Sequence, residues 1–472
     1  MSFPVLSVAE MRDWEARTWA EGVAESTVIE KVGRRIADYL ETAFDADASL
    51  LLLAGRGHNG DDVRAAFDFL DPKRTTLISL NDLRQQVSKV ERALAAQPSV
   101  VVDGLFGIGL NRPVSGLWEA LIKRINDSSS TRVAVDNPSG LNVETGGLSP
   151  HTVRADVTLT VGSPKESFFN SDVAPFIGRL EVLSDVGLSD TMPSARSTSR
   201  YQTEASFKKL IKKRPVVSHK GTYGHVCLLA GSLGYHGAAI LAARAALRAQ
   251  PGLVTVVTSE QAYLPVASQL AAPMVYPWQR GRATIPNNAT ALVIGPGLAA
   301  SKLEPDLRAT SMNLWETSLL PLVADAAALD WLPRVKEQRP WPGPRIITPH
   351  PGEASRMLDC STAEIGGDRV MAVKALAQAY GAIVVLKGHQ SLIAQPGAEP
   401  IYINSTGNPH LAQGGAGDVL AGYIGGLLAQ RDHLSKTPFD LVRYAVFRHG
   451  QTADQLQMGF NNWSAEELAD HL

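Results

Sequence analysis

The feature that most constrains this chain is a repeated succession of a short apolar run, a glycine-rich turn and a helical pattern. Four of the apolar runs are Leu50–Ala54, Leu253–Thr258, Ala291–Ile294 and Ile383–Leu386. They are apolar at nearly every position rather than at alternate positions, which is typical of strands covered on both faces by helices. The pattern therefore predicts an α/β fold with parallel sheets. It also places candidate binding residues in the turns at the carboxyl ends of the strands.

The charge and cysteine content exclude several classes of protein. The 472 residues include 45 Lys and Arg against 47 Asp and Glu, a balance that gives no electrostatic attraction to nucleic acid or an anionic membrane. The two cysteines, Cys227 and Cys360, form no CxxC motif, which argues against a disulfide framework or a cysteine-ligated zinc site. The sequence has neither a signal-peptide pattern nor an uninterrupted apolar stretch of about 20 residues. We therefore expect a cytoplasmic protein that binds neither membranes nor nucleic acid.

A change of composition near the middle of the chain indicates a domain boundary. Residues 189–200 are rich in Ser, Thr and Arg, a basic stretch follows at 208–214, and the apolar runs then resume. Such a polar, weakly apolar segment is typical of a linker. We predict a first domain at 1–190, a linker at 191–213 and a second domain at 214–472, both domains being of ordinary single-domain size.

The most informative motif lies in the second domain, at residues 404–422. Gly414, Gly415 and Gly417 precede an apolar helical pattern that begins near Asp418. Glycines let the backbone approach an anion, and the first N–H groups of a helix can bind it. Asp418 is placed either to cap that helix or to accept a proton from a hydroxyl beside a bound phosphate. Taken alone, the motif fits an ordinary helix start equally well.

Three further turns follow predicted strands of the second domain, at 295–297, 348–353 and 387–391. Ligands of α/β proteins are bound at such turns. Lys387 offers a cation suited to phosphate, and Ser391 offers a hydroxyl. His350 either contacts a ligand or is an ordinary turn histidine between two prolines.

Six motifs of the second domain, taken together, resemble a known family. They lie in order at 218–224, 228–232, 235–239, 295–297, 348–353 and 407–418. The set resembles the ADP/ATP-dependent NAD(P)H-hydrate dehydratases, which have a ribokinase-like fold, and the resemblance covers 214–472. Ala416 stands where that family more often has Ser, a change between two small residues.

The resemblance implies hydrated NADH or NADPH as substrate, ADP or ATP as co-substrate, and Mg²⁺. A phosphoryl group would be transferred to the ring hydroxyl, with Asp418 as the catalytic residue, and phosphate would then leave. The implied substrate-binding residues are Ala238, Gly297, His350 and Asp418. The implied nucleotide-binding residues are Lys387, Gly388, His389, Gln390, Ser391, Gly414, Gly415 and Gly417.

The first domain resembles the NAD(P)H-hydrate epimerases, which have a Rossmann-like fold and are often fused ahead of the dehydratase. The motifs that carry this resemblance are 51–63, 102–113, 134–142 and 155–165. It implies that Asp136 is catalytic, that Asn59, Asp103 and Ser139 bind K⁺, and that the protein is a homo-oligomer. The implied substrate contacts are His58, Asn59, Gly60, Asp61, Asp62, Gly107, Gly109 and Arg112.

The first loop departs from the usual GxGNNGGDG pattern of the epimerases. His58 replaces Asn, and Asp61 and Val63 each replace Gly. Asp61 is expected to put a carboxylate against the substrate diphosphate, and Val63 to resist a left-handed backbone conformation. These changes favour a degenerate scaffold over an epimerase with a modified loop. The second interpretation stays open because other polar positions of the motif persist, namely Asn59, Asp62, Asp103, Asp136 and Ser139.

Two other functions also fit parts of the sequence. A ribokinase-like kinase of a small hydroxylated metabolite would use the same glycine-rich turn and aspartate, although the turn around His350 and the fused first domain argue against it. A non-enzymatic dinucleotide-binding regulator is an alternative for the first domain alone. The sequence distinguishes neither ADP from ATP nor NADH hydrate from NADPH hydrate, because no charged pair in it clearly reads a 2′-phosphate.

Overall fold

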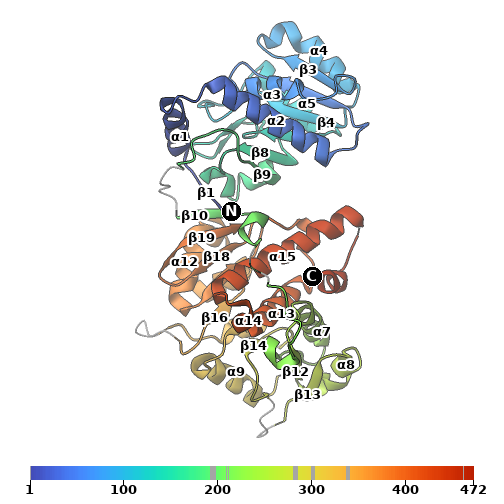
Figure 1. Ribbon diagram of the computed structural model, residues 1–472, viewed down its shortest axis with the longest axis vertical. Coiled ribbons are helices and arrows are strands. Elements are labelled where there is room, and N and C mark those ends of the chain that lie inside the picture. Colours follow the sequence, from blue (N-terminus) through green and yellow to red (C-terminus); the bar gives the residue numbers. More distant parts are fainter. Residues whose placement is uncertain are drawn as a thin grey trace. The chain divides into compact units, whose positions relative to one another are not determined.

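The structure, a computed structural model, describes residues 2–191, 198–208, 210, 212–279, 285–298, 303–335, 341–460 and 462–472. The chain forms two compact units, one of residues 3–198 and one of residues 199–472 with the first two residues (Figure 1). The division at 198/199 falls inside the segment 191–213.

The first unit is built on a six-stranded parallel sheet. Its order is β3 (Thr75–Ser79), β2 (Leu50–Ala54), β4 (Val100–Gly104), β5 (Thr131–Val135), β8 (Val157–Val161) and β9 (Arg179–Leu183). The helices are α1 (Val8–Ala20), α2 (Glu25–Ala43), α3 (His58–Phe67), α4 (Leu83–Ala95), α5 (Leu117–Asp127) and the short α6 (Ala174–Ile177). A small hairpin joins β6 (Leu141–Asn142) to β7 (Gly147–Leu148).

Helices cover both faces of this sheet, which explains the continuous apolar run in β2. Leu50, Leu52 and Ala54 pack into one hydrophobic cluster with α2 and α3. Leu51 and Leu53 pack into a second cluster with α4 and α5. Successive side chains of a strand point to opposite faces, so a strand buried on both faces is apolar throughout.

The second unit contains an eleven-stranded sheet of order β1-β10-β19-β18-β17-β16-β15-β14-β11-β12-β13. Strand β18 is antiparallel to both neighbours, and the other pairs whose register is described are parallel. The strands are β1 (Ser2–Pro4), β10 (Ser199–Gln202), β11 (His225–Leu229), β12 (Leu253–Thr258), β13 (Met274–Pro277), β14 (Ala291–Ile294), β15 (Leu322–Ala324), β16 (Arg345–Ile347), β17 (Ile383–Leu386), β18 (Leu392–Gln395) and β19 (Ala398–Asn404). The helices are α7 (His236–Arg248), α8 (Tyr263–Ala267), α9 (Pro305–Thr317), α10 (Pro351–Leu358), α11 (Thr362–Gly367), α12 (Arg369–Tyr380), α13 (Ala416–Ala429), α14 (Arg431–Leu434), α15 (Pro438–Gly459) and α16 (Ala465–His471).

Small side chains allow two central helices of this unit, α7 and α13, to pack at very short range. A Cβ atom added to Gly422 of α13 would lie 2.0 Å from the carbonyl oxygen of Ala242 in α7. This close packing fixes the position of α13, whose first turn carries the glycine-rich motif.

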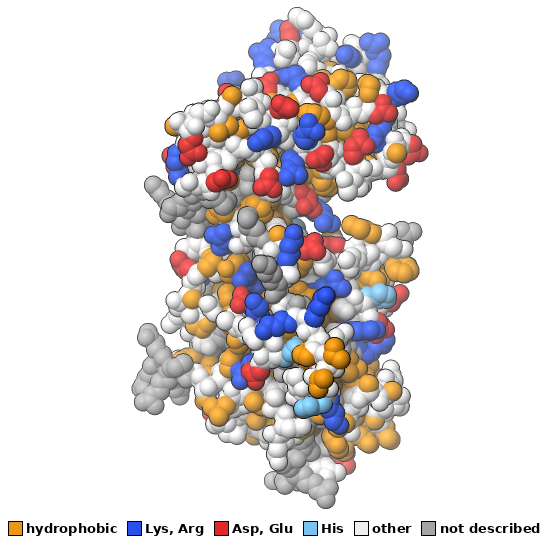
Figure 2. Space-filling model, in the orientation of Figure 1, with side chains coloured by type: hydrophobic (Ala, Val, Ile, Leu, Met, Phe, Trp, Pro, Cys, Tyr) orange, Lys and Arg blue, Asp and Glu red, His pale blue; other side chains and the backbone are white. Residues whose placement is uncertain are grey.

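The visible surface of the first unit carries acidic and basic side chains interspersed, without a patch of one sign (Figure 2). In the part of the chain that is described, no helix combines the length and the hydropathy needed to cross a bilayer.

Candidate active sites

The glycine-rich motif of the second unit forms a turn that leads into α13. Gly415, with a φ of 96°, is the N-cap residue, and the helix begins at Ala416. Asp418 is therefore the third residue of the helix, and the prediction that it caps the helix is wrong. The left-handed conformation of Gly415 turns the chain into the helix before Asp418 is reached.

Beneath this turn lies an ion-pair network centred on Lys387. The Nζ atom of Lys387 is 2.9 Å from Oδ1 of Asp325 and 3.8 Å from Oε2 of Glu353. A Cβ atom added to Gly417 would lie 3.2 Å from the same Nζ. Although burial lowers the pKa of Lys387, the nearby Asp325 and Glu353 carboxylates raise it overall. The lysine is thus held charged, directly against the glycine turn.

Asp418 belongs to the same cluster of charges. Its pKa is raised to about 7, first by burial and then by the Asp325 carboxylate, while Lys387 opposes the shift. A carboxyl group that titrates near neutral pH can exchange protons efficiently at that pH. The geometry therefore brings together the predicted Asp418 and Lys387 with two acids, Asp325 and Glu353, to which sequence reasoning had assigned no role.

His350 caps helix α10. Its Nδ1 accepts hydrogen bonds from the backbone N–H groups of Gly352 at 3.0 Å and Glu353 at 3.3 Å. The backbone N–H of His350 in turn donates to Glu353 Oε2 at 2.8 Å. The side chain is 51% exposed. The structural role of a turn histidine is therefore present, and the exposed part of the ring is free to contact a ligand.

The structure also brings Ala238 and Gly297 together. Gly297 has a φ of 67°, and a Cβ atom added to it would lie 2.9 Å from the Cβ of Ala238. The hydroxyl of Ser232 donates to the carbonyl oxygen of Gly297 at 2.7 Å. The first turn of α7 and the turn after β14, which lie far apart in the sequence, are thus held against each other with no room for a larger side chain at Gly297.

The turn at 387–391 is held by Arg369 of α12. The Arg369 guanidinium donates to the carbonyl oxygens of His389, at 2.5 Å, and Gln390, at 3.4 Å. The Ser391 hydroxyl donates to the carbonyl oxygen of Gly388 at 3.2 Å. Burial, and then the arginine charge, lower the pKa of His389. The turn is therefore rigid and its histidine is neutral at pH 7.

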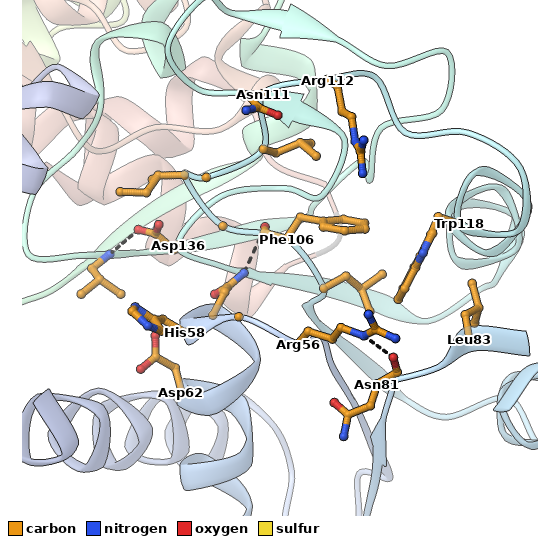
Figure 3. Close-up of a pocket in the computed structure, with 18 of the residues that line it drawn as sticks. Arg56, His58, Asp62, Asn81, Leu83, Phe106, Asn111, Arg112, Trp118 and Asp136 are labelled. Carbon is orange, nitrogen blue, oxygen red and sulfur yellow. Dashed lines mark hydrogen bonds between the residues drawn. The ribbon is translucent and has the colours of Figure 1, made fainter. Parts of the chain in front are cut away.

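The first unit contains a large cavity of about 1140 Å³ at the carboxyl ends of its strands (Figure 3). Seven of the residues predicted as site residues line it: His58, Asn59, Asp62, Gly107, Gly109, Arg112 and Asp136. Four others do not line it, namely Gly60, Asp61, Asp103 and Ser139.

Neither physical argument for a degenerate first loop holds in the structure. Oδ1 of Asp61 pairs with Nη2 of Arg64 at 2.7 Å, and Asp61 does not line the cavity. Val63 lies within the right-handed helix α3, is fully buried, and packs against Gly104. Because α3 begins at His58, position 63 needs no left-handed conformation, and the Asp61 carboxylate is directed to Arg64 rather than into the cavity.

Asp103, Ser139 and Asn59 converge around the backbone of Phe106. The buried Asp103 carboxylate accepts hydrogen bonds from the Ser139 hydroxyl at 2.6 Å and from the Ser139 N–H at 2.8 Å, and burial raises its pKa. The Ser139 hydroxyl accepts from the Phe106 N–H at 3.0 Å, and Asn59 Nδ2 donates to the Phe106 carbonyl oxygen at 3.1 Å. Oδ1 of Asn59 is buried and has no hydrogen-bond partner in the described part of the chain. An orphaned buried oxygen of this kind fits an ion or a water molecule.

Asp136 projects into the cavity from a strained backbone, with a φ of 62°. Its Oδ1 accepts hydrogen bonds from Nζ of Lys165 and, at 3.3 Å, from the N–H of Val161. Lys165, whose side chain is only 1% exposed, also donates to Thr160 Oγ1 at 2.8 Å. Lys165 is the main functional partner that the sequence analysis missed, although the motif at 155–165 ends on it.

Two further carboxyl groups, those of Asp62 and Glu15, share the cavity with Asp136. The pKa of Asp62 is raised well above its ordinary value by burial and then by the Asp136 charge. Burial, and then Asp136, also raise the pKa of Glu15. The cavity therefore holds a lysine-paired carboxylate beside two carboxyl groups whose pKa values are raised by burial.

Comparison with known proteins decides which family has this combination of sites. The NAD(P)H-hydrate dehydratase family profile matches residues 226–472, and the profile described as YjeF-related protein N-terminus matches residues 62–167. The bifunctional NAD(P)H-hydrate repair enzyme of Coxiella burnetii is 32% identical over 98% of this chain and 97% of its own length. The enzyme of the same name from Thermosynechococcus vestitus is 33% identical over 100% of this chain and 97% of its own length. The chain belongs to this family of bifunctional repair enzymes.

A solved structure supports the family assignment for the second unit. The crystal structure of ADP/ATP-dependent NAD(P)H-hydrate dehydratase from Bacillus subtilis, co-crystallised with ATP/Mg²⁺, is 34% identical with a TM-score of 0.50, and the match covers 57% of this chain and 94% of that one. The predicted α/β class, with a Rossmann-like unit followed by a ribokinase-like unit, is confirmed.

In this member of the repair family, the first turn of α3 lies close to the turn after β2, which leads to a prediction about stability. A Cβ atom added to Gly60 would lie 2.1 Å from the carbonyl oxygen of Gly55, whereas one added to Gly57 would meet nothing within 4 Å. We expect Gly60→Ala to lower the free energy of unfolding of the first unit by about 1–3 kcal/mol, and Gly57→Ala to leave it nearly unchanged. Urea denaturation of both variants measures this, and equal stabilities would contradict the close approach.

Proposed function

We propose that this protein repairs hydrated nicotinamide nucleotides with both of its units. The second unit dehydrates (6S)-NAD(P)H hydrate at the expense of ADP or ATP, and the first unit interconverts the R and S hydrates. The observation that carries the dehydratase proposal is Asp418, whose pKa of about 7 is set beside Lys387 at the glycine turn. Family membership favours repair over the alternative of a small-metabolite kinase.

In the second unit, the ionised Asp418 takes the proton of the ring hydroxyl while the hydroxyl oxygen attacks the terminal phosphorus of the nucleotide. The bond from that phosphorus to its bridging oxygen breaks, and the shortened nucleotide leaves. The ring C–O bond of the phosphate ester then breaks, phosphate departs, and loss of a proton from the neighbouring carbon restores the dihydronicotinamide. N–H groups of the turn at Gly414, Gly415 and Gly417 stabilise phosphate charge, as does the turn from Gly388 to Ser391.

The acidic side chains of the second unit fit a Mg²⁺ ion that arrives with the nucleotide. The described residues contain no group of three or more His, Cys, Asp or Glu side chains that could hold a metal by themselves. Protein-bound Mg²⁺ is commonly held by one or two carboxylates together with substrate phosphates. Asp325 is the carboxylate that would do so here, and the ion would offset charge on the transferring phosphate.

In the first unit, inversion requires the ring C–O bond to break and to form again on the other face. Asp62, whose pKa is raised by burial and then by the Asp136 charge, donates a proton to the departing hydroxyl, which leaves as water. Asp136, held by Lys165, then accepts a proton from the water that adds to the opposite face. Two carboxyl groups in different surroundings, one buried and the other paired with a lysine, are typical of such acid–base chemistry.

A K⁺ ion fits the polar cluster beneath this cavity. Asn59, with its unpartnered Oδ1, and the buried Asp103 and Ser139 would hold it. The ion would supply positive charge that offsets the buried Asp103 carboxylate and would fix the loop that carries Asn59.

The decisive experiment is to incubate the protein with mixed R and S hydrates of NADH, Mg²⁺, K⁺ and either ADP or ATP. Recovery of reduced nicotinamide is followed by absorbance at early times, before spontaneous epimerisation matters. We expect nucleotide-dependent recovery of both epimers. Recovery of the S form alone would leave the dehydratase and remove the epimerase, and no recovery with either nucleotide would refute the proposal.

A further inference from the structure

Charged side chains lie on two sides of the cavity of the first unit. The carboxyl groups of Asp62 and Asp136 lie with His58 on one side (Figure 3). Arg56 lies on the other side, beside Asn81 and across from Asp136 (Figure 3). At about 1140 Å³ the cavity exceeds the 300–1,000 Å³ that is usual for drug-sized ligands, so it has room for a whole dinucleotide.

Arg56, in the loop after β2, and Arg84, in the first turn of α4, both line the cavity. Nε of Arg56, in the loop after β2, donates to the carbonyl oxygen of Asn81, in the loop after β3. Arg84 is the second residue of α4, three positions after Asn81, and lines the same cavity. An exposed arginine is usually only solvated, but Arg56 is fixed by this hydrogen bond, and neither guanidinium forms an ion pair within the described part of the chain.

The position of these two loops suggests their ligand. In dinucleotide-binding sheets, the loop after the strand next to the glycine-loop strand reaches the adenosine ribose. An acidic side chain there binds the 2′-hydroxyl of NAD, whereas arginine accommodates the 2′-phosphate of NADP. Strand β3 lies next to β2, and the chain that follows β3 presents Asn81 and, at the start of α4, Arg84. The Asp82 carboxylate between them caps α4 by accepting a hydrogen bond from the Arg84 N–H at 3.0 Å.

We propose that Arg56 and Arg84 bind the 2′-phosphate of NADPH hydrate, so that the first unit prefers the 2′-phosphorylated dinucleotide. This specificity rests on the proposed epimerase function. In this pose the adenosine lies at the arginine side and the hydrated nicotinamide lies beside Asp136, so the dinucleotide spans the cavity.

The test compares initial rates of epimerisation of (R)-NADPH hydrate and (R)-NADH hydrate by the full-length protein. Loss of a charged hydrogen bond to phosphate corresponds to about ten- to a hundredfold in affinity. We therefore expect Arg84→Ala and Arg56→Ala each to lower kcat/KM for the NADPH form about ten- to a hundredfold while changing that of the NADH form less than threefold. Arg124→Ala, which removes an arginine paired with Glu91 outside the cavity, is the matched control and should change neither.

Binding provides a readout that does not depend on epimerase activity. Calorimetric titration with NADP⁺ and NAD⁺ should show that Arg84→Ala weakens the binding of NADP⁺ but not that of NAD⁺. Any binding of these dinucleotides at the second unit is the same in the wild-type protein and in Arg84→Ala, so it cancels when the two are compared. A parallel loss for both dinucleotides, or no loss for either, would overturn the proposal. If the wild-type protein lacked epimerase activity but showed the selective NADP⁺ loss, the epimerase function would fail and the 2′-phosphate site would stand.

Discussion

Replacing Asp418 by Asn is expected to lower the rate of nucleotide-dependent NADH recovery from the S hydrate by a factor of about 10²–10⁴. Asparagine has nearly the same shape but cannot accept the hydroxyl proton, and general-base catalysis contributes a factor of that size. The rate is measured by absorbance under saturating ADP and ATP. Because Asp418 is the third residue of α13 and only partly buried, the variant should remain folded. Retention of more than a tenth of the rate would contradict a role for Asp418 as the base.

The raised pKa of Asp418 predicts a pH dependence of the same reaction. The base is active when ionised, and its pKa is raised to about 7, so the rate should fall as the pH drops below about 7. Asp325→Asn removes a charge that raises this pKa and leaves Lys387 less neutralised, so the acidic limb of the pH profile should move to lower pH. Asp330→Asn, in the same segment but paired with Arg356 at the surface, should leave the limb in place. An unshifted limb in Asp325→Asn would contradict the electrostatic coupling.

The strands were the most predictable part of the fold. The apolar runs Leu50–Ala54, Leu253–Thr258, Ala291–Ile294 and Ile383–Leu386 are strands with those same bounds, because burial on both faces demands apolar residues throughout. Strand β10, of sequence Ser-Arg-Tyr-Gln, has no continuous apolar run from which it could be predicted. It forms a strand by pairing with β19, which the sequence does not show.

The candidate sites were predictable as motifs but not as networks. Asp325 and Lys165 each follow a strand closely, the same signal that pointed to Lys387, yet only the fold shows that they pair with Lys387 and Asp136. Conversely, Asp61 and Val63 were misinterpreted because the sequence does not show that α3 begins at His58. A helix that starts there turns Asp61 toward Arg64 and buries Val63, so the same two residues that suggested a damaged loop become ordinary helix positions.

A comparison of two aspartates in the first unit tests whether that loop still works. Asp136→Asn is expected to lower enzyme-catalysed epimerisation of the R hydrate by about 10²–10⁴, since the amide cannot accept the proton from water. Asp61→Asn, which changes a carboxylate paired with Arg64 outside the cavity, should change it less than threefold. The R to S ratio is followed by chromatography at early times, with the uncatalysed rate subtracted.

Dehydration of the S hydrate is the internal control for both variants. It should be unchanged, because Asp418 and Lys387 belong to the other compact unit. Equal and large losses of epimerisation in Asp136→Asn and Asp61→Asn would mean that position 61, where the family usually has Gly, is also needed for epimerisation. A wild-type rate no faster than the uncatalysed one would instead mean that the first unit is not catalytic, despite the ion pair between the buried Lys165 and Asp136. The structure favours the active outcome, because burial of a lysine against a carboxylate is costly and here it orients Asp136 into an open cavity.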